Sequence, residues 1–508
     1  MFPSKKVDHG KHADDEHSSD FLGPNCSDNG SRLDFDNLYV DFSSALYRGI
    51  IKCTKDSSCD NVSSKVDDET VHVSSCNIKT VKVKDKTLST NARIELASQL
   101  FIEYYSSKID EIADLAHPFA VFASGQSYDE AKDIELLITL LASVEKTSQL
   151  QFDSASQLIE TCNNMSSDEG NPVERLVYYF SAAICEKINK ETGKVSCNVS
   201  EIKEMIDLHE ASMSVDKCVL SFHQNVPLLG ICLYGAVYSI IEKIKGSRQV
   251  HLIDLDIRCG LKYKVMLQNL ANQEWDLDLF KITAVCTRAE SKIKDTGTSL
   301  AEFAKSMNIP FSYKVVMVAD ILDFNTKLLE LNEDEKVAVC APFFFSTLIS
   351  KPNSLEYLMS VIRKINPCIT VMIEIEANHT TPTFENRFTE AMFFYGALFD
   401  CMSYCMADDD RYRKVCESIY FGQSIRNIVA ADGDERTVRH IGVDVWRLFF
   451  ARFGMVEIEV SDESVSEAKS LITSSDCGNA CSIRVDGGCL LIDWKDIPVF
   501  SVSSWKSV

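Results

Sequence analysis

The chain has 508 residues, of which 75 are acidic and 52 are basic, so its formal net charge at pH 7 is -23. This charge excludes a general electrostatic attraction of the whole molecule to phosphate, and any DNA contact would need a local basic groove or a basic partner. The 19 cysteines include no C-x-x-C pair, which favours reduced thiols in a cytosolic or nuclear protein. The pairs Cys401/Cys405 and Cys477/Cys481 each have three intervening residues, and we do not interpret them as a zinc site.

Residues 1–125 are rich in Ser, Asp, Lys and Asn and show little sustained apolar periodicity. Such a segment buries too little apolar surface to offset its ordering entropy, so we expect a mostly disordered N-terminal arm. One candidate exception is a short helix within residues 94–112, where apolar residues recur at helical spacing. We expect that deletion up to about Ser124 leaves the folded domain intact.

Residues 126–245 are expected to be mainly helical. Apolar residues three and four positions apart predict helices around residues 137–144 and 155–162, and a third helix begins at Pro172, a favoured first-turn residue. The longest uncharged run, residues 225–241, is too short for a membrane span. We therefore expect a buried core helix there and no membrane association.

Residues 246–508 alternate short β-branched runs with helical stretches such as 292–307 and 355–365. The expected strands cover residues 250–254, 281–286, 313–318, 337–340, 369–375, 455–460, 489–494 and 499–505. This alternation predicts an α/β fold with a Rossmann-like, doubly wound, mostly parallel sheet and an α-helical cap.

Ligands of such sheets bind beyond the carboxyl ends of the strands. A nucleotide or methyltransferase cofactor would need a glycine cluster after the first strand, so that the protein backbone can approach the cofactor closely. Gly260 is the one glycine in that segment. The second strand runs into Arg288 instead of the acidic residue that would hold a ribose hydroxyl. We therefore expect no cofactor and no enzymatic activity.

The fifth strand leads to Glu374 and Glu376, then to Asn378 and His379. Two carboxylates beside a histidine suit acid–base chemistry or metal binding, but polar residues at strand ends also cap helices and fix loops. We favour the structural role, because no nucleophile or substrate pocket accompanies these residues. No catalytic or metal-binding residue is assigned.

The segment Val250-His251-Leu252-Ile253-Asp254 resembles the VHIID motif of the plant GRAS family, and leucine-rich regions lie on both sides of it. Residues 376–400 and 426–440 are similar to the family's PFYRE region. The C-terminal segment around Trp494 and Trp505 is similar to its SAW motif. Residues 126–508 are thus identified as a GRAS domain, closest to the DELLA branch, although the arm contains no DELLA-type motif.

The resemblance implies a nuclear transcriptional regulator that acts as a protein-binding scaffold in plant signalling or development. Its expected partners are DNA-binding transcription factors and other GRAS proteins, as homo- or heterodimers, with DNA contacted indirectly or weakly. The candidate motif or partner-binding residues are Val250, His251, Ile253, Asp254, Gly260, Glu376, Asn378, His379, Arg387, Arg426, Arg436, Trp494 and Trp505.

Two alternative functions stay open at this point. One is a small-molecule methyltransferase-like enzyme with an atypical cofactor loop. The other is a direct, sequence-specific DNA binder, which would need a positive surface around Arg426, Arg436, Arg439 and His440.

Overall fold

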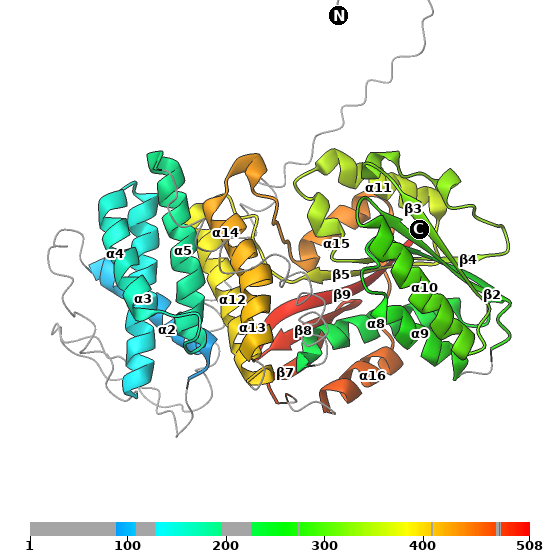
Figure 1. Ribbon diagram of the computed structural model, residues 1–508, viewed down its shortest axis with the longest axis horizontal. Coiled ribbons are helices and arrows are strands. Elements are labelled where there is room, and N and C mark those ends of the chain that lie inside the picture. The colour runs from blue at the N-terminus through cyan, green and yellow to red at the C-terminus, as the bar shows by residue number, and fades with distance from the viewer. Residues whose placement is uncertain are drawn as a thin grey trace, which may run out of the picture.

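The computed structural model describes residues 88–107, 127–194, 225–272, 275–407, 410–473, 477 and 479–508. In this part of the chain, a nine-stranded sheet with helices on both faces lies beside a bundle of long helices (Figure 1). Most of the expected arm, residues 1–87 and 108–126, lies outside the described residues, so its disorder stays a prediction.

Five parallel strands form one side of the sheet, in the spatial order β3-β2-β1-β4-β5. They are β1 (Gln249–Asp254), β2 (Leu279–Cys286), β3 (Phe311–Met317), β4 (Lys336–Pro342) and β5 (Ile369–Ile375). The strand order reverses between β1 and β4, and doubly wound sheets bind ligands at the carboxyl ends of the strands beside such a reversal. The expected α/β fold is confirmed.

The other side of the sheet is antiparallel. Here β9 (Ile497–Ser507) pairs with β5 and with β8 (Cys489–Trp494), and β8 pairs with β7 (Cys481–Asp486). The C-terminal part of β9 also pairs with β6 (Met455–Glu457), which is shorter than the expected 455–460. Sequence analysis missed β7, because this edge strand is polar and largely exposed and so shows little apolar alternation.

Side chains alternate between two buried clusters, one on each face of the sheet. Leu252 and Ile282 belong to the first cluster, whereas Ile253 and Val339 belong to the second. The first cluster includes residues of α8 (Pro227–Ile244), α9 (Leu261–Ala271) and α10 (Glu290–Ser306), and it continues into the helical bundle. The second includes residues of α11 (Pro352–Ile365) and α15 (Val443–Arg452). The expected helices at 292–307 and 355–365 correspond to α10 and α11.

Helix α8 is long and apolar enough to cross a membrane, by length and composition alone. In the structure it contacts β5, β8 and β9, and also α16 (Asp462–Thr473). Its side chains at Leu228, Ile231 and Cys232 are fully buried. In this fold α8 is therefore a core helix, as its short uncharged run predicts.

The bundle beside the sheet combines helices from both halves of the chain (Figure 1). Its members are α2 (Thr90–Ser107), α3 (Tyr128–Ser148), α4 (Phe152–Met165), α5 (Pro172–Thr192), α12 (Phe384–Cys405), α13 (Asp410–Cys416) and α14 (Gln423–Ala430). Helix α12 contacts α2, α3, α5 and α14 in the bundle and β8 and β9 in the sheet, so it joins the two parts.

Helix α5 begins and ends at residues with clear local signals. The side chain of Asn171 accepts hydrogen bonds from the backbone N–H groups of Val173 and Glu174, and Pro172 occupies the first turn. Gly193, at φ +67°, ends the helix in the left-handed conformation that glycine adopts without strain. The expected start of the helix at Pro172 is therefore confirmed.

Helix α2 corresponds to the short helix expected within residues 94–112, and it belongs to the folded core. Its Ile94 and Ala97 are fully buried, and it contacts α3 and α12. Thr90 Oγ1 donates a hydrogen bond to Asp400 on α12 at 2.9 Å. We therefore propose that the folded unit begins at about residue 88, and not at residue 126.

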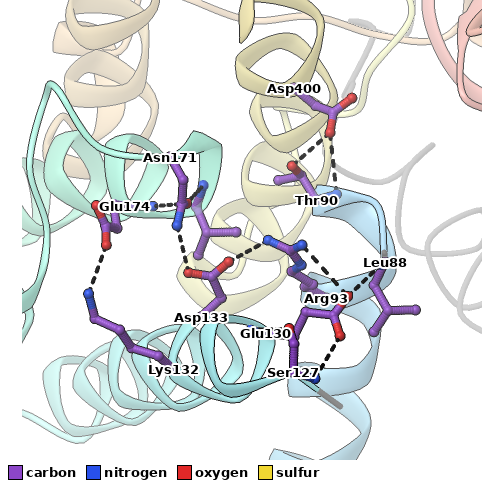
Figure 2. Close-up of polar contacts among 11 residues, drawn as sticks. Leu88, Thr90, Arg93, Ser127, Glu130, Lys132, Asp133, Asn171, Glu174 and Asp400 are labelled. Atoms are coloured by element: carbon purple, nitrogen blue, oxygen red, sulfur yellow. Dashed lines mark hydrogen bonds and ion pairs between the residues drawn. The ribbon is translucent and has the colours of Figure 1, made fainter. Parts of the chain in front are cut away.

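A polar network fixes the start of α2 against α3 and α5 (Figure 2). Arg93 forms an ion pair with Asp133, and Asp133 in turn accepts a hydrogen bond from Asn171 at 3.0 Å. Glu130 accepts hydrogen bonds from the backbone N–H groups of Leu88 and Ser127. Because most of these partners are partly or fully buried, the contacts order α2 more strongly than surface ion pairs would.

Two N-terminal deletions test this boundary. A chain that begins at residue 88 should keep the stability of the full chain, because it retains α2. Deletion of residues 1–124 should lower the free energy of unfolding by at least about 3 kcal/mol, because it removes buried apolar side chains and leaves Asp133 without Arg93. Urea unfolding compares the two proteins. Equal stability would show that α2 does not belong to the core.

Candidate functional site at the carboxyl edge of the sheet

Buried polar side chains meet at the carboxyl end of β1. Asp254, the last residue of β1, is fully buried and lies 2.9 Å from Lys262 Nζ. The hydroxyl of Tyr263 and the backbone N–H of Asp256 also donate hydrogen bonds to its carboxylate. Lys262 and Tyr263 belong to the first turn of α9, which packs against the end of β1. We call Asp254, Lys262 and Tyr263 the Asp254 cluster.

The pKa values of Lys262 and Tyr263 follow from their burial and from the nearby carboxylate of Asp254. Burial alone lowers the pKa of Lys262, but the Asp254 carboxylate outweighs it, so the pKa of Lys262 is raised. Burial, followed by the charge of Asp254, raises the pKa of Tyr263 well above its usual range. The cluster is therefore one buried ion pair with a neutral phenol, at the edge of the sheet where doubly wound folds bind ligands.

Gly260 serves helix packing in this structure. At φ +67° it precedes the first residue of α9, and a Cβ atom there would lie 2.8 Å from Thr296 Cγ2 of α10. The guanidinium of Arg258 lies 5.3 Å from the centre of the Phe343 ring, and Arg258 Nε donates to Asp256 at 2.6 Å. The single glycine of this turn thus allows α9 and α10 to approach each other.

The two carboxyl groups at the end of β5 hold neighbouring backbone segments. Glu374 accepts a hydrogen bond from the Ser346 N–H at 3.1 Å, which fixes the short helical turn after β4. Both oxygens of Glu376 lie 3.1 Å from the Val443 N–H at the start of α15. Burial raises the pKa of each carboxyl to about 7. Both groups therefore act as backbone acceptors, and Glu376 caps a helix N-terminus.

His379 lies within the protein and pairs with a second histidine, His440. Their Nδ1 atoms are 2.9 Å apart, so one ring donates and the other accepts. The His379 ring also stacks on Tyr395, at 9° between the planes. Burial lowers the pKa of His379 well below its usual range and that of His440 to about 4. Both rings are neutral at pH 7, which suits the donor–acceptor pair.

Acidification should destabilise the protein through this pair. Because the folded-state pKa of His440 is depressed, its contribution is fully present above pH 6.5 and is lost as the pH falls toward 4. The loss should reach about 2 kcal/mol at pH 5 relative to pH 8. Glu374 and Glu376, whose pKa values are raised, act in the opposite direction, because they favour the folded state at low pH and lose that contribution as the pH rises through 7.

The measurement is urea unfolding of the wild-type protein and His440→Gln at pH 8 and pH 5. The variant should lose less stability on acidification, because the carboxyl contributions cancel in the comparison. An equal loss in both proteins would rule out His440 as the titrating group.

Three other candidate residues come together near His379. Arg436 Nη1 donates to the His379 carbonyl at 3.3 Å, and Arg387 donates to the carbonyls of Thr381 and Ile428 at 3.1 and 2.9 Å. Asn378, half-buried, accepts a hydrogen bond from Thr380 at 3.3 Å. These contacts join the segment after β5 to the segment after α14.

The remaining candidates lie elsewhere in the fold. His251 is fully buried between Glu335, 3.0 Å from its Nδ1, and Thr283, 2.8 Å from its Nε2. Val250 and Ile253 point to opposite faces of the sheet. The two candidate tryptophans are buried and hydrogen-bonded. Trp494 Nε1 donates to Asp400 at 2.8 Å, and Trp505 Nε1 donates to Ser503 at 2.9 Å.

The basic residues considered for DNA contact are engaged within the protein. Arg426 Nη2 lies 2.6 Å from Glu186, and Arg436 is buried. Arg439 donates to the carbonyls of Arg436 and Gly433. His440 is buried, and its lowered pKa keeps it neutral. Of these four residues, Arg436 and His440 are buried and Arg426 is paired with Glu186, so Arg439 is the half-exposed cation that remains, which weakens the DNA-binding alternative.

Sequence reasoning missed Lys262 and Tyr263, because a lysine and a tyrosine in a first helical turn give no motif signal. It also missed a buried ionic group within the bundle, in which Arg175 Nε and Arg413 Nη1 lie 3.1 and 2.9 Å from Glu417. The available signal was Asp254 at the end of an expected core strand, since a buried carboxylate requires a partner.

The fold and the site define a class of protein: an α/β domain with a doubly wound sheet whose first strand ends in a buried Asp–Lys–Tyr cluster. The family model described as the GRAS domain family matches residues 135–506, and the chain belongs to this family.

Curated relatives and a solved structure agree with this assignment. The "DELLA protein GAI1" of Vitis vinifera is 25% identical over 377 residues, and the "DELLA protein RGA" of Arabidopsis thaliana is 26% identical over 378 residues. Each match covers 73% of this chain and 62% of the relative, so the chain spans less than two thirds of their length. The crystal structure of SCL7 from Oryza sativa has a TM-score of 0.63 and 21% identity, covering 73% of this chain and 99% of that chain, and shows the same fold.

Proposed function

We propose that this chain is a plant regulator of transcription or signalling that acts in the nucleus as a protein-binding scaffold without catalysis. The observation that carries the proposal is the Asp254 cluster, because its polar groups bind one another at the edge where doubly wound sheets bind ligands. Membership of the GRAS family and the DELLA-type relatives support a regulatory role.

The proposed partners are DNA-binding transcription factors and other GRAS proteins, with DNA reached through them. The acidic net charge of -23 supports the adaptor role, because a basic DNA-binding partner would bind such a surface more readily than DNA would. Most of the motif residues lie inside the domain. We therefore propose that they affect partner binding by maintaining the fold, and not by direct contact.

The chain should not bind S-adenosylmethionine usefully. The Asp254 cluster occupies the space near β1, and Cys286 and Arg288 offer no carboxylate for a ribose at the end of β2. Losing two independent contacts should weaken affinity by roughly two to four orders of magnitude relative to a functional site. Isothermal titration with S-adenosylmethionine measures this. A micromolar dissociation constant, or methyl transfer to a nuclear-extract component, would overturn the scaffold proposal.

The scaffold role itself is tested by capture from plant nuclear extract. The tagged full chain should retain DNA-binding transcription factors identified by mass spectrometry, before and after nuclease treatment. The heat-unfolded chain serves as the control for non-specific capture. If nuclease treatment abolished all capture, the chain would instead reach its partners through DNA, as a direct DNA binder would.

A further inference from the structure

Two pairs of cysteines from distant parts of the sequence lie together where the bundle meets the sheet. Cys405 is the last residue of α12, and Cys401 lies one turn earlier, with its sulfur 3.8 Å from that of Cys405. The sulfur of Cys477 lies 2.9 Å from Cys405 Sγ. Cys481 begins β7, and its backbone N–H donates a hydrogen bond to the Cys477 carbonyl at 3.3 Å.

The four thiols differ in exposure and acidity. Cys401, Cys477 and Cys481 are buried, whereas Cys405 is only half-buried. Burial raises the pKa of Cys401 well above its usual range and that of Cys481 to about 12. Hydrogen bonds from the Cys401 and Cys477 thiols lower the pKa of Cys405. Cys405 is therefore the thiol of the group best placed to react, because its pKa is lowered, the residue is only half-buried, and the thiolate is the nucleophile.

The arrangement suits a covalent bond better than a metal centre. Among the described residues, no group of three or more His, Cys, Asp or Glu side chains is placed to hold a metal ion. The sulfurs of Cys405 and Cys477 are in direct contact and belong to different elements, which allows a bond between them. Cys401 is on the same helix as Cys405, so it can donate a hydrogen bond to the thiolate but is a poor disulfide partner.

We propose that Cys405 and Cys477 form a reversible disulfide in response to hydrogen peroxide. The Cys405 thiolate attacks one peroxide oxygen, the O–O bond breaks, and the departing hydroxide takes a proton to become water. This step leaves a sulfenic acid on Cys405. The Cys477 sulfur then attacks the Cys405 sulfur, and the sulfenic oxygen leaves as a second water with the Cys477 thiol proton. Two thiols thus lose two electrons, and one peroxide is reduced to two waters.

The disulfide would tie the bundle to the edge of the sheet. Helix α12 contacts α2, α3, α5 and α14, whereas the segment that carries Cys477 leads into β7 at the sheet edge. The bond would close a loop between positions 72 residues apart, which restricts the unfolded chain and stabilises the folded one. Oxidation would therefore fix the bundle against the sheet, and thiol reductants would release it.

The test uses the full chain with Cys259→Ser as background, because Cys259 is exposed and would otherwise form links between molecules. Reduced protein is treated with hydrogen peroxide, its remaining thiols are alkylated, and the non-reduced digest is mapped by mass spectrometry. We expect a cross-linked peptide pair containing Cys405 and Cys477, lost on treatment with dithiothreitol. The melting temperature should rise by several degrees on oxidation.

Single substitutions provide the controls. Cys405→Ser and Cys477→Ser should abolish the cross-link and the rise in melting temperature. Cys185→Ser, which removes a half-buried thiol on α5, should keep both. The proposal is overturned if peroxide-treated protein that carries both Cys405 and Cys477 yields no cross-linked peptide containing them. It is also overturned if metal analysis finds one tightly bound zinc per chain that Cys405→Ser releases.

Discussion

Replacement of Trp505 with alanine should lower the free energy of unfolding by about 3 to 5 kcal/mol, the range for large-to-small aromatic changes in cores. Trp505 is 1% exposed and stacks on Phe450 of α15, with ring centroids 4.4 Å apart. It also lies on β9 opposite Thr370 of β5 and Glu457 of β6, so the cavity would open where three strands meet. Urea unfolding measures the loss.

Tyr128→Ala is a suitable control, because this side chain is 84% exposed and its removal should change stability by less than about 0.5 kcal/mol. Partner capture by Trp505→Ala should fall only in proportion to the unfolded fraction. A variant of unchanged stability that no longer captures partners would make Trp505 a contact residue and contradict its role as a core anchor.

Replacement of Lys262 with methionine should cost about 3 to 5 kcal/mol, because it leaves the fully buried Asp254 carboxylate without its cation. Methionine has nearly the same length as the lysine stem, so little packing is lost. The free energy of unfolding, measured at neutral pH, reports the cost. Lys264→Met, on the same helix but more exposed, should change it by less than about 1 kcal/mol.

The double variant Asp254→Asn with Lys262→Met separates charge from packing. Removing both charges should restore much of the stability that the single variant loses, since a neutral pair pays little desolvation cost. If the double variant were less stable than Lys262→Met, the carboxylate would be held mainly by Tyr263 and the backbone of Asp256.

The parallel strands could be predicted because each contains a short apolar run with β-branched residues, and the central strands β1, β4 and β5 are largely buried. Helices with local signals, such as Pro172 and Asn366 at their ends, were also recognisable. Helix α12 was not, because buried residues such as Phe388, Phe394 and Ala397 lie on several sides of it and obscure the helical period. Its apolar surface reflects contacts with both the bundle and the sheet, which only the tertiary structure provides.

The candidate site shows the same division. The glycine-poor turn after Asp254 already indicates from the sequence that the backbone there cannot approach a cofactor closely. The contacts of Lys262 and Tyr263 with Asp254 depend on how the first turn of α9 packs against β1, and no local sequence pattern indicates this packing. Likewise, His379 pairs with a residue 61 positions away and Cys405 with one 72 positions away, so neither pair could be deduced from spacing.

The position of β9 in the chain also constrains how the protein is made. The ribosome synthesises the chain from its N-terminus, so β9 is made last. Its partners β5, β6 and β8 are all synthesised before it. Until residues 497–507 emerge, one edge of β5 has no neighbour, and unpaired strand edges promote association with other chains. We expect nascent chains that stall before this strand to need chaperones, whereas release of β9 completes the sheet in a single late step.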